Sequence, residues 1–200
     1  MTTQEPIGVF ILAGGTSSRM GRAKGLLTFA GKPLLVHVAR LVESVAEQPV
    51  IIGPASAYGG MGFRVVGDDR RNLGPLGGIS TALRVTTRGW NLIVGCDLPF
   101  LTREWLEFLI ERAMDSPADV VIPLNERGYE PLCALYRKRA HGAIEAALAR
   151  GVRKITDGLK ELTLTAIEPS EWKAFDPRGR LFKNVNTPAD YEQARGEAET

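Results

Sequence analysis

Apolar residues fall into two patterns that alternate along the chain. Short apolar runs of the kind found in buried strands alternate with segments in which apolar residues recur every three or four positions, as on one face of a helix. The runs predict strands at 7–12, 49–52, 63–66, 91–95, 119–123, 130–136 and 163–167. The periodic segments predict helices at 34–45, 74–85, 102–114, 137–150 and 188–195, with a shorter helix at 153–159.

This succession of strands and helices predicts an α/β fold. We expect one Rossmann-like three-layer domain over residues 1–200, with a mostly parallel sheet and a polar tail from about residue 196. The strand at 91–95 is apolar on both faces and is therefore expected near the centre of the sheet. Segments 55–62 and 124–128 predict a loop and a polar turn.

Composition narrows the classes of function. The chain has 200 residues, and its 25 basic and 23 acidic side chains give a net charge of +2 without a basic cluster, which disfavours nucleic-acid binding. No apolar run approaches the roughly 20 residues of a membrane span, and residues 1–6 lack the features of a signal peptide. The two cysteines and two histidines lie too far apart for a zinc site, and free thiols indicate a cytoplasmic protein.

A glycine-rich basic loop follows the first predicted strand. Residues 12–24 read Leu-Ala-Gly-Gly-Thr-Ser-Ser-Arg-Met-Gly-Arg-Ala-Lys. Gly14 and Gly15 allow a ligand to approach the backbone closely, and consecutive N–H groups can form an anion site. Arg19 and Lys24 add positive charge suited to a polyphosphate. The adjacent glycines do not match a dinucleotide fingerprint, and the spacing to Lys24 does not match a P-loop.

Acidic residues follow two further predicted strands. Asp68 and Asp69 come after strand 63–66, and Asp97 comes after strand 91–95. The carboxyl ends of strands are where open α/β sheets bind ligands, and Mg²⁺ prefers carboxylate and phosphate oxygens. Asp97 is therefore the leading metal-ligand candidate, because Thr102 already provides a start for the following helix. Either Asp68 or Asp69 can belong to the site or to a solvated loop.

Three other residues carry both a functional and a structural interpretation. Glu130, fixed beside a proline, is a candidate for contact with an acceptor substrate or an exposed strand-end glutamate. Asn186 is a candidate to complete a metal, phosphate or acceptor site, or it belongs to the capping turn of the last helix. His37 lies within a predicted helix, and its position favours a partly buried structural role.

Five motifs, in this order along the chain, resemble those of one family. They are the loop at 12–24, Gly-Pro-Leu-Gly-Gly-Ile at 74–79, Cys-Asp-Leu-Pro-Phe-Leu at 96–101, Glu-Pro-Leu-Cys-Ala-Leu-Tyr at 130–136 and Asn-Val-Asn-Thr-Pro at 184–188. Together they are similar to the molybdenum cofactor guanylyltransferases, the MobA family. That resemblance implies the nucleotide-diphospho-sugar transferase (glycosyltransferase-A-like) fold.

The resemblance also implies a reaction and its participants. Members of this family use Mg²⁺ to transfer GMP from GTP to molybdenum-bearing molybdopterin, with release of pyrophosphate. Nucleotide contacts are implied at Leu12, Ala13 and Gly14, with Gly15 in the same loop, and at Lys24, Asp68 and Asp97. Independently of the resemblance, the chemistry of such a transfer makes Arg19, Lys24 and Asp97 the expected catalytic residues, because Asp97 would hold the Mg²⁺ while Arg19 and Lys24 would hold the leaving pyrophosphate. Acceptor molybdoenzymes or their chaperones are candidate partners, and the oligomeric state stays open.

Two positions depart from the family pattern, and other functions fit the same motifs. Ala23 replaces a usual aspartate, and Gly53 stands where some members have an asparagine that contacts nucleotide. One alternative is a cytidylyltransferase or another nucleotidyltransferase with a sugar or cobinamide phosphate acceptor. Another is a non-catalytic nucleotide-binding module in cofactor delivery, which the presence of Asp97 disfavours.

Overall fold

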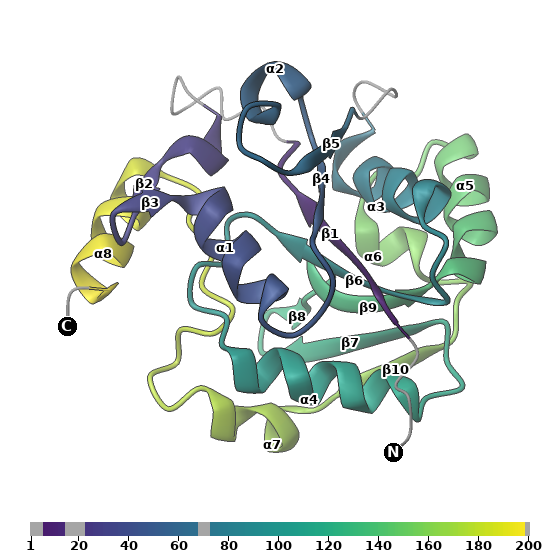
Figure 1. The fold of residues 1–200 in the computed structure, drawn as a ribbon. Helices are drawn as coiled ribbons and strands as arrows, with labels where there is room; N and C mark the ends of the chain where they lie inside the picture. Colours follow the sequence, from purple (N-terminus) through teal and green to yellow (C-terminus); the bar gives the residue numbers. More distant parts are fainter. Residues whose placement is uncertain (1–5, 15–22, 68–72, 199–200) are drawn as a thin grey trace.

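The computed structural model describes residues 6–14, 23–67 and 73–198, which form a central sheet between helices (Figure 1). The strand order is β10-β7-β9-β6-β1-β4-β5, and β8 pairs with β7. The strands are β1 (Gly8–Leu12), β4 (Val50–Ile52), β5 (Arg64–Val66), β6 (Trp90–Gly95), β7 (Val120–Asn125), β8 (Gly128–Tyr129), β9 (Cys133–Arg137) and β10 (Leu164–Ile167). A separate hairpin joins β2 (Thr28–Phe29) and β3 (Lys32–Pro33).

The sheet is mostly parallel, as the sequence predicts. Strands β5, β4, β1 and β6 are parallel to one another, and β10 is parallel to β7. Strand β9 lies antiparallel between β6 and β7, and β8 returns antiparallel to β7. All six residues of β6 are buried, and the strand lies in the middle of the order, which confirms its predicted central position.

Helices cover both faces of the sheet and complete the three predicted layers (Figure 1). One face packs against α1 (Leu34–Glu43), α4 (Arg103–Met114) and α7 (Pro169–Trp172), and the other against α3 (Gly74–Val85), α5 (His141–Ala149) and α6 (Ile155–Gly158). Alternate residues of β1 reach the two cores, with Val9 and Ile11 on the first face and Phe10 and Leu12 on the second. Each such side chain stabilises the fold by about 1.5–3 kcal/mol when fully buried.

The last helix, α8 (Pro188–Ala198), lies beside the β2–β3 hairpin (Figure 1). Its predicted cap is confirmed, because Thr187 Oγ1 accepts a hydrogen bond from the Asp190 N–H at 3.1 Å. The Tyr191 hydroxyl donates to the Thr28 carbonyl, and Phe29 packs in one small cluster with Ala194. Segment 182–187 is thereby held near Lys24.

Several element boundaries differ from those predicted. Residues 55–58 form a short helix, α2 (Ala55–Tyr58), rather than a loop, because Tyr58 is buried and anchors this turn. Strand β7 continues to Asn125 because β8 pairs with it and closes a hairpin. Strand β9 begins at Cys133 instead of residue 130, since residues 131–132 form a turn. Short 3₁₀ helices occupy Lys24–Leu26, Lys138–Ala140 and Lys173–Phe175.

Helix α5 begins at His141, four residues later than predicted, because Arg137 is still paired with β6. Thr102 caps α4 as predicted, accepting from the Trp105 N–H at 3.2 Å. His37 has the expected structural role, since its Nε2 is 2.9 Å from the Pro99 carbonyl and its ring contacts Phe29 edge-on. Within the described residues, no helix has the length and apolar character needed to span a bilayer.

Candidate active site

The candidate site lies where the paired strands β1 and β6 end. Leu12 is in register with Gly95, and the Cys96 N–H donates to the Leu12 carbonyl at 3.1 Å. The chain proceeds from β1 toward β4 and β5 on one side, whereas β6 pairs with β1 on the other. Open α/β sheets bind ligands at such a switch in strand order. The loop after β1 and Asp97 after β6 therefore share one edge of the sheet.

Three side chains from distant parts of the sequence meet at this edge. Lys24 Nζ lies 3.1 Å from Asp97 Oδ2 and 2.7 Å from Asn186 Oδ1. The side chains of Lys24 and Asp97 are only 19% and 18% exposed, so the ion pair is largely shielded from solvent. The Val185 N–H also donates to the Asp97 carbonyl at 3.0 Å, which joins the C-terminal segment to the end of β6. We refer to Lys24, Asp97 and Asn186 as the charged cluster.

Lys24 retains hydrogen-bonding capacity in this arrangement. A lysine ammonium has three N–H donors. Two of them are directed at Asp97 and Asn186, and no further acceptor is found for Lys24 among the described residues. One donor can therefore reach an added anion. Asn186 also has the structural role considered from sequence, because its backbone N–H donates to Asp190 Oδ2 at 3.0 Å. The turn that caps α8 thus positions its amide side chain.

Gly95 leaves the room that the Asp97 carboxylate occupies. A Cβ at position 95 would lie 2.5 Å from Asp97 Oδ1 and 3.4 Å from the Leu132 Cβ. Real side chains do not approach so closely, and the flexible carboxylate is the group that can give way. The Asp97 carboxylate can therefore occupy its position only because residue 95, at the end of β6, is a glycine.

We expect Gly95→Ala to lower activity while leaving the fold intact. Displacement of the Asp97 carboxylate should reduce turnover about tenfold, less than the ~10²-fold that a 1 Å misplacement of a reacting group can cost. Steady-state nucleotidyl transfer and thermal unfolding measure the two effects. Gly142→Ala is the matched control, because a Cβ there meets no atom within 4 Å. Unchanged turnover in Gly95→Ala would show that the carboxylate position is not critical.

Residues at the carboxyl ends of β1 and β4 pack closely against Tyr58. The Ala13 N–H donates to the Ile52 carbonyl at 2.9 Å, and the Tyr58 hydroxyl donates to the Ala13 carbonyl at 3.3 Å. A Cβ at Gly53 would lie 3.2 Å from the Ala13 carbonyl carbon and 3.2 Å from the Tyr58 ring. This packing explains the glycine at position 53. Burial raises the pKa of Tyr58 to about 12, so its hydroxyl stays a neutral donor.

The other predicted nucleotide contacts differ in which of their atoms can reach a ligand. The Leu12 side chain packs into the core, where a Cβ at Gly78 would be only 3.0 Å from it, so Leu12 and Ala13 can present backbone atoms alone. Gly14 is exposed at the start of the loop. The predictions for Gly15, Arg19 and Asp68, and the alternative Asp69, lie outside the described residues.

Glu130 lies at the edge of the site. Asn125 Nδ2 donates to Glu130 Oε1 at 2.5 Å, and the Glu130 N–H donates to the Pro123 carbonyl at 2.9 Å. Burial raises the pKa of Glu130 above its usual range, the Asn125 hydrogen bond and the Arg127 charge oppose that rise, and the negative charge of Asp97 adds to it. The negative charge of Asp97 therefore acts on the Glu130 carboxyl group. Glu130 is partly buried and is not the exposed strand-end glutamate that the sequence also allowed.

The neighbouring cysteines are not nucleophiles. Burial raises the pKa of the Cys96 thiol to about 12, and the Asp97 charge adds to the rise. Burial likewise raises the pKa of Cys133 to about 12, although a hydrogen bond from Trp105 Nε1 partly opposes it. Both groups stay protonated near neutral pH, which leaves phosphate positioning and charge stabilisation as the chemistry that this edge supports.

Sequence reasoning missed Tyr58 and Asn125. Tyr58 lies in a segment read as a loop, and Asn125 lies in a segment read as a turn. The detectable signal for Asn125 was its position three residues before Gly128, which closes the β7–β8 hairpin with a φ of 113°. No comparable sequence signal marks Tyr58.

Comparison with known proteins identifies the family of the chain. The model of the MobA-like NTP transferase domain matches residues 9–163. The chain belongs to this family. The molybdenum cofactor guanylyltransferase of Pseudomonas aeruginosa is 36% identical over 187 residues, covering 92% of this chain and 91% of that protein. A probable molybdenum cofactor guanylyltransferase of Carboxydothermus hydrogenoformans is 35% identical, covering 92% of this chain and 93% of that one.

Solved structures extend the likeness of this MobA-like chain to its whole fold. Molybdopterin-guanine dinucleotide biosynthesis protein A of Archaeoglobus fulgidus superposes with a TM-score of 0.85 at 27% identity, covering 96% of this chain and 99% of that one. The 2-C-methyl-D-erythritol 4-phosphate cytidylyltransferase of Thermus thermophilus has a TM-score of 0.73 at 15% identity, covering 98% and 100%. The nucleotide-diphospho-sugar transferase fold is thereby confirmed, and the chain is a nucleotidyltransferase of the MobA-like family.

Proposed function

We propose that this nucleotidyltransferase transfers GMP from GTP to the terminal phosphate of molybdenum-bearing molybdopterin. The observation that carries the proposal is the charged cluster at the end of β1 and β6, which places a lysine, a carboxylate and an amide oxygen within hydrogen-bond distance. The guanylyltransferases among its relatives supply the two substrates by name.

The proposed reaction is a displacement at phosphorus. An oxygen of the molybdopterin phosphate forms a bond to the α-phosphorus of GTP. The bond from that phosphorus to the oxygen bridging the α- and β-phosphates breaks, and pyrophosphate leaves with the electron pair. Such a transfer requires in-line positioning and neutralisation of charge, with little covalent participation by the protein. The buried, protonated thiols of Cys96 and Cys133 are consistent with that scheme.

Lys24 is the group that binds the triphosphate. Its ammonium is held by Asp97 and Asn186, so its remaining donor is aimed before the substrate arrives. A preorganised cation stabilises charge that develops on a leaving pyrophosphate without reorganising during the reaction. The exposed Gly14 can add its backbone N–H, and Arg19 of the same loop is assigned to the pyrophosphate as well.

The charged cluster also fits a divalent metal, which NTP transferases of this kind generally use. Asp97 offers a carboxylate and Asn186 an amide oxygen, and Mg²⁺ is commonly held by one or two carboxylates together with substrate phosphates. No group of three or more histidine, cysteine or acidic residues suited to a metal occurs in the described part of the chain. Asp97 is the proposed ligand, and the bound Mg²⁺ would supply Lewis-acid stabilisation of the phosphates.

Nucleotide selectivity tests the proposed function. We expect GTP–Mg²⁺ to bind more tightly than CTP–Mg²⁺ or ATP–Mg²⁺, since the loop at 12–24 and the motif at 74–79 match the guanylyl branch of the family. Calorimetric titration measures binding, and pyrophosphate release from each of the four NTPs, with and without molybdopterin, measures transfer. Equal or tighter binding of CTP would assign the chain to cytidylyl transfer, and release without acceptor dependence would reject molybdopterin as the acceptor.

We place this reaction in the reducing cytoplasm. Cys96 and Cys133 are both free and buried, as expected of thiols that are kept reduced. Recovery of active enzyme after expression in a reducing compartment, compared with secretion into an oxidising one, tests this assignment.

A further inference from the structure

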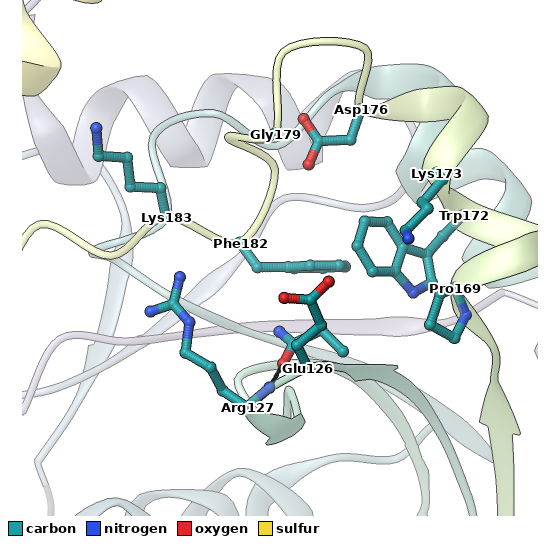
Figure 2. Close-up of a pocket in the computed structure, with 10 residues that line it drawn as sticks. Glu126, Arg127, Pro169, Trp172, Lys173, Asp176, Gly179, Phe182 and Lys183 are labelled. Carbon is teal, nitrogen blue, oxygen red and sulfur yellow. Dashed lines mark hydrogen bonds between the residues drawn. The ribbon is translucent and has the colours of Figure 1, made fainter.

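A cavity of about 470 Å³ opens between the β7–β8 hairpin and the segment that leads to α8 (Figure 2). Glu126 and Arg127 contribute from the hairpin, and Trp172, Lys173 and Phe182 contribute from the C-terminal half. The volume lies within the range of about 300–1,000 Å³ that is typical of small-molecule sites. The mechanism proposed above uses none of these five side chains.

The cavity combines an aromatic wall with two acidic residues, Glu126 and Asp176. The Phe182 ring packs edge-on against Trp172 with centroids 4.9 Å apart, and the Trp172 Nε1–H donates to the Leu124 carbonyl at 2.8 Å, so the wall is rigid. Figure 2 shows the Glu126 carboxylate directed toward the Phe182 ring. Glu126 is exposed, and no partner is found for its carboxylate among the described residues. A ligand between them would meet a π-face and a hydrogen-bond acceptor.

Cations line the same cavity but leave Glu126 without a close ion pair. Figure 2 shows the Arg127 guanidinium extending away from the Glu126 carboxylate, and Lys173 on the same wall of the cavity as Trp172. Lys183 is paired with Glu197 at 2.7 Å, and Asp176 Oδ1 accepts from the Arg180 N–H at 2.7 Å. Because Asp176 is held by the backbone, the Glu126 carboxylate is left for a neutral donor group, and the Arg127 and Lys173 cations for an anionic one.

The cavity is within reach of the transfer site. Lys183 lines it, and Asn186 contacts Lys24 only three residues later, a span of at most about 10 Å of extended chain. On the opposite wall, Asn125 lines the cavity and also donates to Glu130, whose carboxyl group feels the Asp97 charge. A flat ligand in the cavity could therefore extend a phosphate-bearing arm to the charged cluster.

We infer that this cavity holds the pterin ring of the acceptor, with the Glu126 carboxylate accepting hydrogen bonds from its 2-amino-pyrimidinone edge and Phe182 lining its face. This inference rests on the proposed function. A 2-amino-pyrimidinone edge presents two parallel N–H donors, and a carboxylate accepts such a pair in a bidentate arrangement. Guanine carries the same edge, so the experiment must separate the acceptor from the nucleotide.

Glu126→Gln tests the assignment, because it keeps the size of the side chain and removes its charge. We expect the KM for molybdopterin to rise roughly tenfold or more, as for loss of a charge-assisted hydrogen bond, with kcat and the GTP dissociation constant unchanged. Glu104→Gln, an exposed glutamate on α4, is the matched control. Phe182→Leu, which keeps an apolar wall but removes the π-face, should also raise this KM.

A titration with 6-hydroxymethylpterin, monitored through the fluorescence of this probe, measures binding to the cavity directly and does not depend on turnover. The probe should bind the wild-type chain and bind Glu126→Gln about tenfold more weakly. An unchanged KM for molybdopterin with unchanged probe affinity, or a loss confined to GTP affinity, would overturn the assignment. Probe binding that depends on Glu126, in a chain that transfers no GMP to molybdopterin, would instead reject the proposed function and keep a pterin site.

Discussion

Asp97→Asn should reduce nucleotidyl transfer by about 10²- to 10³-fold in kcat, the scale seen when one preorganised electrostatic group is removed from an active site. The asparagine keeps the size of the side chain and one oxygen acceptor for Lys24, but it removes the negative charge that the proposed metal ion requires. Stabilisation of the transition state should be lost to a greater extent than GTP binding, because the metal acts mainly on charge that develops during the reaction.

The fold should survive this substitution. Lys24 Nζ keeps its 2.7 Å contact with Asn186 Oδ1, and the Val185 N–H bonds to the backbone carbonyl of residue 97, which the mutation leaves in place. The measurement is transfer at saturating GTP and molybdopterin over a range of Mg²⁺ concentrations, alongside circular dichroism. Asp115→Asn, at an exposed position after α4, is the control. Near-normal turnover with unaltered Mg²⁺ dependence would move the metal site to Glu130, Asp68 or Asp69.

The proximity of Lys24 to Asp97 follows from the sequence through one topological rule. Both residues come after apolar runs that read as parallel strands, and the carboxyl ends of parallel strands share one edge of a sheet. Their separation of 73 positions in the sequence therefore does not prevent their contact from being predicted. The same periodicity arguments predicted both helical layers, because strands and helices that are buried along their length carry strong patterns.

The contact of Asn186 with Lys24 could not be read from the sequence in this way. It depends on where α8 packs, and α8 has almost no amphipathic pattern of its own to indicate a partner. The helix is placed by a few contacts with the β2–β3 hairpin, such as that of the Tyr191 hydroxyl with the Thr28 carbonyl. Hairpin strands of two residues carry no periodicity, so the hairpin that α8 packs against was not predictable, although the helix itself was.

The cavity lined by Glu126, Trp172 and Phe182 could not be predicted from the sequence for a related reason. Its walls are the β7–β8 hairpin and the short elements α7 and Lys173–Phe175, each too short for a periodic pattern. Strand β9 was predicted to begin at residue 130 because residues 130–136 read as one apolar run, yet the turn at 131–132 precedes it. Tertiary contacts, among them the bond from the Tyr136 hydroxyl to the Pro131 carbonyl at 2.7 Å, determine that turn.

Lys24→Ala should weaken GTP binding and transfer while preserving the fold. Loss of a charge-assisted contact with phosphate costs about 1.5–3 kcal/mol, which corresponds to a roughly 10- to 150-fold fall in kcat/KM. The substitution also leaves Asp97 without its cation, so part of the loss should appear in kcat as the carboxylate loses its fixed orientation.

Stability should change little, because most of the fold's stabilisation comes from the two cores on either side of the sheet, and Lys24 belongs to neither. Calorimetric titration of GTP–Mg²⁺, steady-state transfer and thermal unfolding separate these effects. Lys32→Ala is the matched control, since Lys32 is exposed on the β2–β3 hairpin and no anionic partner is found for it among the described residues. Equal dissociation constants and rates for the wild type and Lys24→Ala would show that the loop amides hold the triphosphate without this ammonium, and that the lysine serves only to neutralise Asp97.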